Sequence, residues 1–500
     1  MVLHDPFHGV YVVHGNDSAI EYYGDKDGKD VCAQFMQSSV YKYKRLIVKK
    51  PLGRTMTFEH SIDASSLDAS QMKGAIVFKA GAVNTSGEQT YSGAVRLEED
   101  TTLTAQNAKI TVNATVSGQK SLTVTGASST IINTDDITTG GAQTYDCPVE
   151  LAKDATLSAS NVIFDKTLDG TKGLTIASAT LQKFKGDVGS VKPLAYLRTS
   201  AGQTTLGGSS GSSSILVKTT GYQAYNGAVT LDSDATLETV SSAAIAFEDK
   251  VKCGSNAHSL EITGNAQVHF KKEVGEGTPP LSALTTGVNA TTKISAAQIT
   301  TSGAQTYGGA VTLDANATLT AYAVTFTSTL DDSNAGTNSL TIAGTAAQTF
   351  NGAVGGTEAL KTLTTGTGLS TINGGSVKTT GEQRYKGAVQ LGSDATLTGS
   401  LVTFAGTVNG AGFLKTVGNA VAINGGSVKT KNAQSYGGAV ELGADATIET
   451  ENEAAVTFNG TVNSDSAGSD EHALTIAGKA QAEFKADVGL GTKGLTSLTT

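Results

Sequence analysis

The stretch Gly303–Thr320, GAQTYGGAVTLDANATLT, decides the fold because close copies of it occur six times in the chain. The shared pattern is Q-x-Y-x-x-x-V-x-L, and its tyrosines are Tyr91, Tyr145, Tyr225, Tyr307, Tyr385 and Tyr436. Successive tyrosines are 54, 80, 82, 78 and 51 residues apart, so the repeat has a short and a long form. Repetition at such periods indicates a repeat architecture rather than one compact core.

The long form differs from the short form by an inserted segment. In the unit of Tyr307 this segment is AAQTFNGAVGGTEALKTLTTG, residues 346–366, and related segments occur at Phe184, Phe270 and Phe484. A tandem of immunoglobulin-like sandwiches could not lose several strands from the middle of a domain, because each domain closes its own core. The coils of a solenoid contact only their neighbours, so one coil can be absent. The length variation therefore favours a solenoid.

Short alternating runs indicate which kind of solenoid is formed. Val311, Leu313, Leu319, Val324 and Phe326 alternate with polar residues at period two, and turn residues separate the runs. This pattern predicts strands of three to five residues and no sustained helix. We therefore predict an all-β fold, a parallel β-helix or β-solenoid of roughly 20 residues per coil over residues 72–500, with strands about 4.8 Å apart.

The same alternation predicts which side chains lie inside. Gln305 and Tyr307 share the parity of Val311 and Leu313, so we expect a mostly buried Tyr307 whose hydroxyl has a polar partner at the coil edge. The repeated glycines, such as Gly309 and Gly375, are expected at positive φ or at tight corners. Each coil is expected to repeat the same internal packing. Phenylalanines fall into two slots that can stack at one corner: Phe164, Phe247, Phe326, Phe404 and Phe458 in the first, and Phe184, Phe270, Phe350 and Phe484 in the second.

Both ends of the chain depart from the repeat. Residues 1–71 contain no copy of the phrase, and they are interpreted either as a cap over the first coil or as a poorly ordered leader. The last residues, Phe484–Thr500, match Phe350–Thr365 and stop inside a unit, so we expect the chain to be a piece of a longer protein.

Composition excludes several classes of function. The net charge of -9 argues against a nucleic-acid partner. No run of about 18 apolar residues occurs, so no integral membrane helix is expected. Cys32, Cys147 and Cys253 are too few and too scattered for a disulfide framework or a metal site. We expect no cofactor, no metal site and no catalytic residues, because no serine-protease triad, HExxH, P-loop or dinucleotide motif is present.

Two N-terminal motifs have both a functional and a structural interpretation. GDKDGKD, residues 24–30, resembles a calcium loop, but its glycine spacing and the missing glutamate do not fit an EF-hand, so a solvated turn is favoured. YKYKRLIVKK, residues 41–50, mixes aromatic and basic residues as nucleic-acid surfaces do. In an acidic chain, an exposed strand is favoured.

Polar residues within the repeats also have two interpretations. His258 and His472 occupy a position that holds Asn338, Lys120 or Lys172 in other copies, which indicates a turn rather than a catalytic base. Acidic turns around Asp234 and Asp445 could align carboxylates for calcium, but solvated turn acids are favoured. GGSSGSSS, residues 207–214, is interpreted as a loop that protrudes from a coil.

Three stretches carry a resemblance to a known group of proteins: GAQTYGGAVTLDANATLT (303–320), VTFAGTVNGAG (402–412) and LTIAGTAAQTFNGAV (340–354). They resemble repeats of large bacterial exoproteins of the filamentous-haemagglutinin and autotransporter-passenger type. The resemblance covers about residues 72–500. It implies a right-handed β-helix, export to the cell surface or the medium in association with an outer membrane, and an adhesin type of function.

The leading hypothesis is a non-enzymatic rod or stalk of a surface or secreted adhesin, with a glycan or protein on a host or neighbouring cell as partner. One alternative is a carbohydrate-active β-helix enzyme such as a polysaccharide lyase, which requires a cluster of acid, base or metal groups that breaks the repeat locally. The other is ice binding through threonine arrays, suggested by LTTG at Leu284 and Leu363. These triplets occur about once per long unit, so that array is expected to be sparse.

Overall fold

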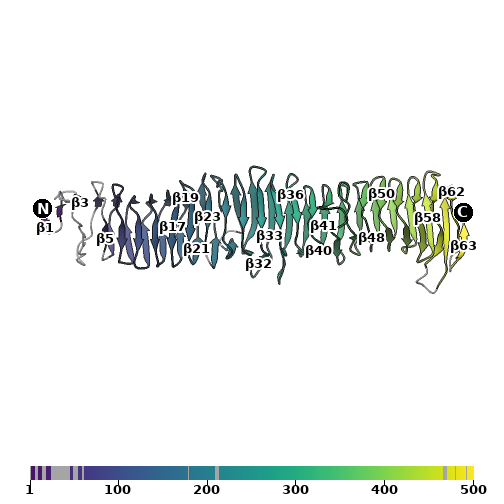
Figure 1. The fold of residues 1–500 in the computed structure, drawn as a ribbon, viewed down its shortest axis with the longest axis horizontal. Helices are drawn as coiled ribbons and strands as arrows, with labels where there is room; N and C mark the ends of the chain where they lie inside the picture. The colour runs from purple at the N-terminus through teal and green to yellow at the C-terminus, as the bar shows by residue number, and fades with distance from the viewer. Residues whose placement is uncertain are drawn as a thin grey trace. The chain divides into compact units, whose positions relative to one another are not determined.

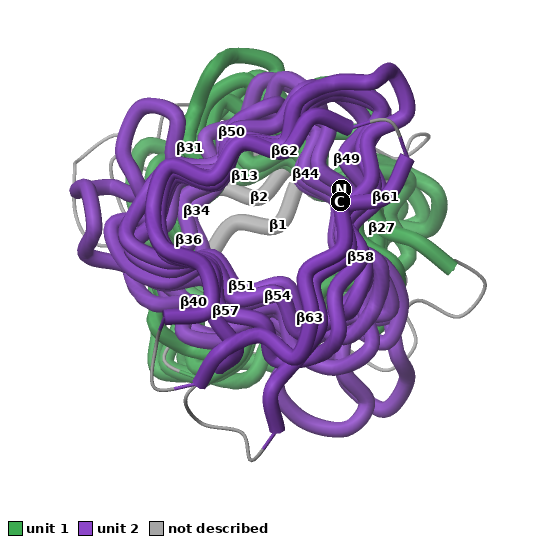
Figure 2. The backbone as a smooth tube through the Cα atoms, turned by 90° about the vertical axis from the view of Figure 1, so that its right-hand side faces the viewer, with its two compact units in different colours: residues 1–249 green, residues 250–500 purple. Residues whose placement is uncertain are grey.

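The computed structural model forms β-solenoid coils in two compact units, residues 1–249 and 250–500. It describes residues 55–58, 61–177, 180–208, 213–465, 470–478, 480–490 and 493–500, together with the backbone of four N-terminal strands. Every regular element among these residues is a strand, which confirms the predicted all-β class. Within each unit, strands of successive coils lie side by side (Figure 1), and the coils enclose a common interior (Figure 2).

Each coil of the first unit contributes one strand to each of three parallel ladders. Ladder 1 contains β7 (Leu67–Ala69), β10 (Gln89–Tyr91), β13 (Lys109–Val112), β16 (Ser129–Ile132), β19 (Val149–Leu151), β22 (Leu168–Gly170), β27 (Ser214–Thr219) and β30 (Asp234–Thr239). Ladder 2 contains β5 (Met56–Phe58), β8 (Ile76–Phe78), β11 (Val95–Leu97), β14 (Val116–Gly118), β17 (Asp136–Thr139), β20 (Ala155–Ser158), β23 (Leu174–Ile176), β25 (Leu197–Arg198), β28 (Gln223–Tyr225) and β31 (Ala244–Phe247). Ladder 3 contains β6 (Ile62–Ala64), β9 (Ala82–Thr85), β12 (Thr101–Ala105), β15 (Leu122–Thr125), β18 (Gln143–Asp146), β21 (Asn161–Phe164), β24 (Leu181–Phe184), β26 (Gln203–Leu206) and β29 (Val229–Leu231).

The second unit has three ladders of the same kind, and β32 (Val251–Cys253) begins it. Ladder 4 contains β33 (Ser259–Gly264), β35 (Ala283–Thr286), β38 (Ala304–Tyr307), β41 (Ala323–Phe326), β44 (Ala347–Phe350), β46 (Ser370–Ile372), β49 (Val389–Leu391), β52 (Val408–Gly410), β55 (Ser427–Thr430), β58 (Ala446–Thr450), β61 (His472–Gly478) and β63 (Leu495–Thr499). Ladder 5 contains β34 (Gln267–Phe270), β36 (Thr291–Ile294), β39 (Val311–Leu313), β42 (Leu330–Asp332), β47 (Ser376–Lys378), β50 (Ala395–Thr398), β53 (Leu414–Val417), β56 (Gln434–Tyr436), β59 (Val456–Phe458) and β62 (Ala482–Phe484). Ladder 6 contains β37 (Gln298–Thr300), β40 (Ala317–Thr320), β43 (Leu340–Ala343), β45 (Leu363–Thr364), β48 (Glu382–Tyr385), β51 (Leu401–Phe404), β54 (Ala420–Ile423), β57 (Ala439–Leu442) and β60 (Val462–Ser464).

The N-terminal strands pair differently. β1 (Val2–Asp5), β2 (Gly9–Val13) and β3 (Ala19–Tyr23) form antiparallel pairs, and β4 (Arg45–Val48) lies parallel to both β3 and β7. The parallel coils already include β5, β6 and β7, which precede residue 72. The role of residues 1–71 as cap or leader, the boundary at residue 72 and the right-handed coil sense stay predictions.

The Q-x-Y phrase does not recur once per coil, which corrects the expectation that each coil repeats the same packing. The phrase lies in β10, β18 and β28. The step from β10 to β18 is eight strands along the chain. The step from β18 to β28 is ten strands, and the bridging residue Val188 fills one further ladder position, which makes eleven. In the second unit the counts from β38 to β48, which include the bridging residue Val354, and from β48 to β56 are eleven and eight. At three strands per coil, the repeat therefore advances 2⅔ or 3⅔ coils, and the phrase lies once on each of the three ladders of each unit.

The inserted segment of the long form is one coil. In the unit of Tyr307 it supplies β44, the bridging residue Val354 and β45, one strand position to each of ladders 4, 5 and 6. The expectation that long and short forms differ by one coil is thus confirmed. Since the other ladder strands keep their neighbours above and below, the insertion leaves the order of the three faces unchanged.

Candidate functional site

The interior of each repeat is organised by a buried glutamine and tyrosine on one strand. Tyr307 is fully buried, and its hydroxyl donates a hydrogen bond to Gln305 Oε1 at 3.1 Å. Burial raises the pKa of Tyr307, so the hydroxyl keeps its proton and acts as the donor. Gln305 Nε2 donates to the carbonyls of Ile299 and Thr320, which belong to successive coils, at 3.0 and 3.1 Å. The predicted burial of Tyr307 is confirmed, and its polar partner is the glutamine inside the same strand.

All six repeats contain this arrangement. The tyrosine hydroxyl donates to the glutamine two residues earlier at 2.6–3.3 Å. The glutamine amide donates to the carbonyls six residues before and fifteen residues after it in every copy. A buried amide costs free energy unless its hydrogen bonds are satisfied, and here the amide nitrogen donates to two successive coils while the amide oxygen accepts the tyrosine hydroxyl of the same strand. These polar residues are therefore structural and are not accessible to a ligand.

Aromatic rings stack along the axis of the coils, as the two phenylalanine slots predict. Tyr307, Phe326 and Phe350 occupy the same register in successive strands, with ring centroids 5.1 and 5.5 Å apart and interplanar angles of 11° and 4°. The phenylalanine pairs Phe164–Phe184 and Phe458–Phe484 repeat this geometry. The sequence analysis did not predict that the repeat tyrosine begins five of these stacks, although its inward parity was the available signal.

Two of the glycines illustrate the corners predicted from the sequence. Gly375 adopts φ of 70°, in the left-handed region that favours glycine. At Gly309 an added Cβ would lie 2.0 Å from the carbonyl oxygen of Ala290, so a side chain cannot fit between the coils.

The acidic turns considered for calcium have a structural partner. Asp445 Oδ1 accepts a hydrogen bond from the amide of Ala473 in the following coil at 2.8 Å. The equivalent Asp100, Asp154, Asn316 and Asp394 accept an amide of the following coil at 2.8–2.9 Å. Asp234 is exposed at the start of β30. Among the described residues, three or more histidine, cysteine or acidic side chains do not gather as a metal site would require.

The two histidines lie where a corner loop returns to a strand, as the turn interpretation predicts. The amide of His258 donates to Cys253 Sγ at 3.2 Å, and the amide of His472 donates to Ser464 Oγ at 2.8 Å. Both contacts use the backbone and not the imidazole. GDKDGKD lies outside the described residues, as do residues 209–212 of GGSSGSSS and most of YKYKRLIVKK, of which only the backbone of β4 is described.

The corner that holds these histidines has two forms in the chain. Where the corner is tight, the last strand residue is glycine, as at Gly118, Gly170 and Gly410. Where it carries a longer loop, the same position holds Cys253, Asp332 or Ser464, whose side chain accepts the amide of the residue at which the loop returns. The exchange of glycine for a hydrogen-bond acceptor at this position is the sequence signal for the longer loop.

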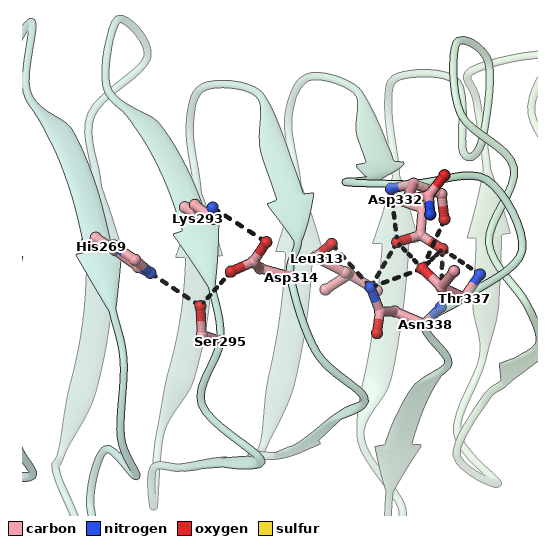
Figure 3. Close-up of polar contacts among 9 residues, drawn as sticks. His269, Lys293, Ser295, Leu313, Asp314, Asp332, Thr337 and Asn338 are labelled. Atoms are coloured by element: carbon pink, nitrogen blue, oxygen red, sulfur yellow. Dashed lines mark hydrogen bonds and ion pairs between the residues drawn. The ribbon is translucent and has the colours of Figure 1, made fainter.

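Asp332 organises the longest of these loops that is fully described (Figure 3). Its buried carboxylate accepts the amides of Thr337 and Asn338 at 2.9 and 2.8 Å and the side-chain amide of Asn338 at 2.7 Å. Burial alone would raise the pKa of Asp332, but hydrogen bonds donated by Asn338, Asn334 and Thr337 outweigh it and lower that pKa below its usual value. The loop is thereby held against the coil in one conformation.

Asp332→Asn should therefore loosen this loop in a pH-dependent way. A carboxyl whose pKa is lowered on folding stabilises the fold above its unfolded pKa of about 3.9, and the stabilisation is lost as the pH falls through the folded value. At pH 7 we expect amide exchange in residues 333–339 to correspond to a local loss of about 1–3 kcal/mol. Below the folded pKa of Asp332 the variant and the parent chain should converge. A loss that is the same at pH 7 and at low pH would contradict this role of the charge.

A second polar cluster lies on the outer side of ladder 5 (Figure 3). Ser295 Oγ donates to Asp314 Oδ2 at 2.9 Å and also lies 2.9 Å from His269 Nε2, while Lys293 Nζ lies 3.0 Å from Asp314 Oδ1. In a Ser-His-Asp triad the histidine lies between the serine and the carboxylate and removes the serine proton. Here the serine lies in the middle and its proton is directed at the carboxylate. This order supplies a hydrogen-bonded link between three coils rather than a base-activated nucleophile.

Outward residues of ladder 4 form a column of five threonines. Thr285, Thr306, Thr325, Thr349 and Thr371 occupy one register in successive strands. The expectation of a sparse array was wrong. The LTTG triplet supplies only the first of these threonines, and the segments AQTY, AVTF, AQTF and STI supply the other four. The column is half-buried and uncharged.

The architecture and these sites define a β-solenoid repeat protein with a structural interior and polar outer faces. The part of the chain that the structure describes has no helix with the length and hydropathy of a transmembrane span. The chain is similar to outer membrane protein A of Rickettsia rickettsii, with 28% identity over 277 residues, which is 53% of this chain and 11% of that protein. No family model and no solved structure matches the chain.

Proposed function

We propose that the chain is part of the non-enzymatic rod or stalk of a large bacterial exoprotein of the adhesin type, located at the cell surface or secreted. The observation that carries the proposal is the similarity to an outer membrane protein. The repeats contribute a physical reason. Their inward residues are retained in all six copies, whereas the outward residue of V-x-L varies: Arg96, Glu150, Thr230, Thr312, Gln390 and Glu441. The interior then maintains the coil while the three faces are free to serve attachment.

The proposed partner is a glycan or protein on the surface of a host or neighbouring cell. Because the phrase lies once on each ladder of a unit, related outer surfaces point in three directions around that unit. Several weak contacts made by such surfaces together can exceed the affinity of one contact by orders of magnitude. Attachment would then need no deep pocket.

Beads coated with the purified chain test this proposal. We expect them to attach to cultured epithelial cells about tenfold more than beads coated with the heat-denatured chain or with albumin. Equal attachment of native and denatured chain would contradict the proposal. Release of unsaturated or reducing sugar from acidic polysaccharides by the purified chain would overturn it in favour of the enzyme.

Ice binding is a second candidate function, and the threonine column of ladder 4 favours it. Its hydroxyls repeat at the strand spacing of about 4.8 Å on a regular, uncharged face. Shaping of ice crystals by the native chain, absent after denaturation, is the result that this candidate requires.

A further inference from the structure

The outer surface of ladder 2 contains a pair of tyrosines that breaks the repeat. Tyr196 and Tyr222 each precede the first inward residue of a strand, and those inward residues, Leu197 and Gln223, are register partners. The two rings stack with centroids 5.2 Å apart and an interplanar angle of 9°. In the other copies of the phrase the position of Tyr222 holds alanine or glutamate: Glu88, Ala142, Ala304, Glu382 and Ala433.

The preceding coil is adapted to this pair. Gly173 lies one coil before Tyr196 in the same column, since Leu174 pairs with Leu197. A Cβ added to Gly173 would lie 2.0 Å from the ring of Tyr196, so that ring covers the glycine backbone directly. Other copies hold larger residues here: Ser121, Ser259, Ser339, Phe413 and Ala473. Three successive coils therefore carry residues in this column that break the repeat: Gly173, Tyr196 and Tyr222. With glycine at the first position, the rings can lie flat against the solenoid.

The outermost ring is accessible. Tyr222 keeps 41% of its surface exposed, and Val240 in the following corner keeps 52%. Tyrosine offers an apolar ring face together with a hydroxyl that bonds to water or ligand, which suits surfaces that are partly apolar and partly hydroxylated. A stack supported from below by Gly173 and Tyr196 loses little side-chain entropy when a ligand binds, because the rings are already in place.

Two cations lie beside the rings in the chain. Arg198 shares the outward side of its strand with Tyr196, and its register neighbours Thr175 and Ala224 are small and uncharged. Lys172 precedes Gly173 at the same corner, and its carbonyl accepts the amide of Ala195. Neither Arg198 nor Lys172 forms an ion pair with any residue that the structure describes.

Four lysines of this unit form ion pairs between coils. Lys153, Lys183, Lys192 and Lys218 each lie within 2.5–3.0 Å of a carboxylate oxygen of another coil. Exposed lysines without an ion pair to a described residue also occur elsewhere in this unit, for example Lys109 and Lys166, but Arg198 and Lys172 lie next to the stacked tyrosines in the chain. Arginine binds carboxylates through two parallel hydrogen bonds, which makes Arg198 the stronger of the two candidates for an acidic ligand.

We propose that Tyr196, Tyr222 and Arg198 form a binding site for an acidic pyranose of a cell-surface glycan. The apolar face of the sugar ring would lie on the tyrosine stack, and its carboxylate would pair with Arg198, with Lys172 adding positive charge at the corner. The site rests on the proposed function in that it supplies the partner class for attachment. Stacking, free positive charge and exposure occur here together, and that combination favours an acidic sugar over a peptide.

Binding of defined sugars tests the site without cells. The full chain is measured by biolayer interferometry on immobilised sialyllactose, with neutral lactose as the matched probe. We expect saturable binding to sialyllactose and at least about tenfold weaker binding to lactose. Tyr222→Ala and Arg198→Gln should each weaken sialyllactose binding about tenfold or more. No binding to sialyllactose, or equal affinity for the two sugars, would overturn the site.

Matched variants exist in the second unit. Tyr322 is 79% exposed at a corresponding corner, and Arg384 points outward from β48 between Thr364 and Thr403. Tyr322→Ala and Arg384→Gln should leave the affinity within about twofold of the parent chain, since both residues lie outside the proposed site and surface substitutions of this kind leave the fold largely unchanged. Equal losses in these controls would contradict a local site. Far-UV circular dichroism of Tyr222→Ala and Arg198→Gln should match the parent chain.

Attachment of coated beads separates this site from the proposed function. If the parent chain attaches to cells and loses attachment both after sialidase treatment of the cells and with Arg198→Gln, both proposals are supported. If attachment survives both changes or is abolished only by trypsin treatment of the cells, the sugar site is overturned and the adhesin function stands. If the chain binds sialyllactose but does not attach to cells, the site stands and the proposed function fails.

Discussion

Phe326→Ala should lower the free energy of local unfolding of its coils by about 3–5 kcal/mol. Phe326 is 1% exposed and lies between the rings of Tyr307 and Phe350, at 5.1 and 5.5 Å. The substitution removes a buried ring and leaves a cavity lined by two rings that the backbone ladders hold apart. Because strand spacing is set by hydrogen bonds along the ladder, the coils cannot close over the gap.

Hydrogen exchange of the amides in β38, β41 and β44 measures this loss in the full chain, where unfolding of repeats need not be two-state. Phe404→Ala is the matched control. Phe404 is equally buried but stacks on Tyr385 alone, and the next strand places Ile423 in its register. Aromatic pairs contribute about 0.5–1.5 kcal/mol beyond burial, so the loss at Phe404 should be smaller by that amount. A loss below about 1 kcal/mol at Phe326 would refute the packing described for the stack.

The sequence predicted the inward side of this core well. Alternation placed Gln305, Tyr307 and Phe326 inside, since parity along a strand is a local property. It did not predict that Tyr307 begins the aromatic stack or that the phrase moves from ladder to ladder. Both depend on register between strands about twenty residues apart, and that register is set by the length and geometry of the corners between them.

Candidate sites were harder to predict for the same reason. Ser295, Asp314 and His269 are far apart in sequence, and only the coil period brings them within 2.9 Å contacts. Tyr196 and Tyr222 lie 26 residues apart in sequence and become neighbours because Leu197 and Gln223, which follow them, are register partners. The lengths of the corners decide which outward residues of successive strands become neighbours. An alignment of the repeats that ignores corner length therefore cannot predict such columns.

Removal of residues 348–369 should leave a folded solenoid, whereas removal of half that segment should unfold the coils around it. Residues 348–369 comprise one coil, because Gln348 pairs with Val324 in the preceding strand and with Ser370 in the following one. After the deletion, β46 would follow β41 in ladder 4. Val354 and β45 leave with β44, so β47 would follow β42 and β48 would follow β43. All three ladders stay continuous, as they are in the short repeats of the native chain.

The loop that rejoins the chain is also of native length. Ile342 would precede Ser370 by six residues, the same separation as between Val124 and Thr130 in the short repeat after Tyr91. The new contact would set Phe326 against Ile372, and both are buried side chains of ladder 4. The loss of one aromatic pair should lower the stability of that interface by about 0.5–1.5 kcal/mol. The solenoid should stay folded, because its other coil interfaces are unchanged.

Deletion of residues 348–358 is the matched control. It removes β44 and Val354 but leaves β45, so the strand that arrives in ladder 4 comes from ladder 6 and every later residue is displaced by a third of a coil or more. The strands on the two sides of the deletion would lose their native register partners and corner lengths, and we expect fast amide exchange and protease cleavage in the flanking strands β41–β46. Full protection in the whole-coil variant and loss of protection in the half-coil variant is the required pair of results. Equal protection in both would mean that the coils do not share one continuous ladder within the second unit, because only a continuous ladder requires insertions to come in whole turns.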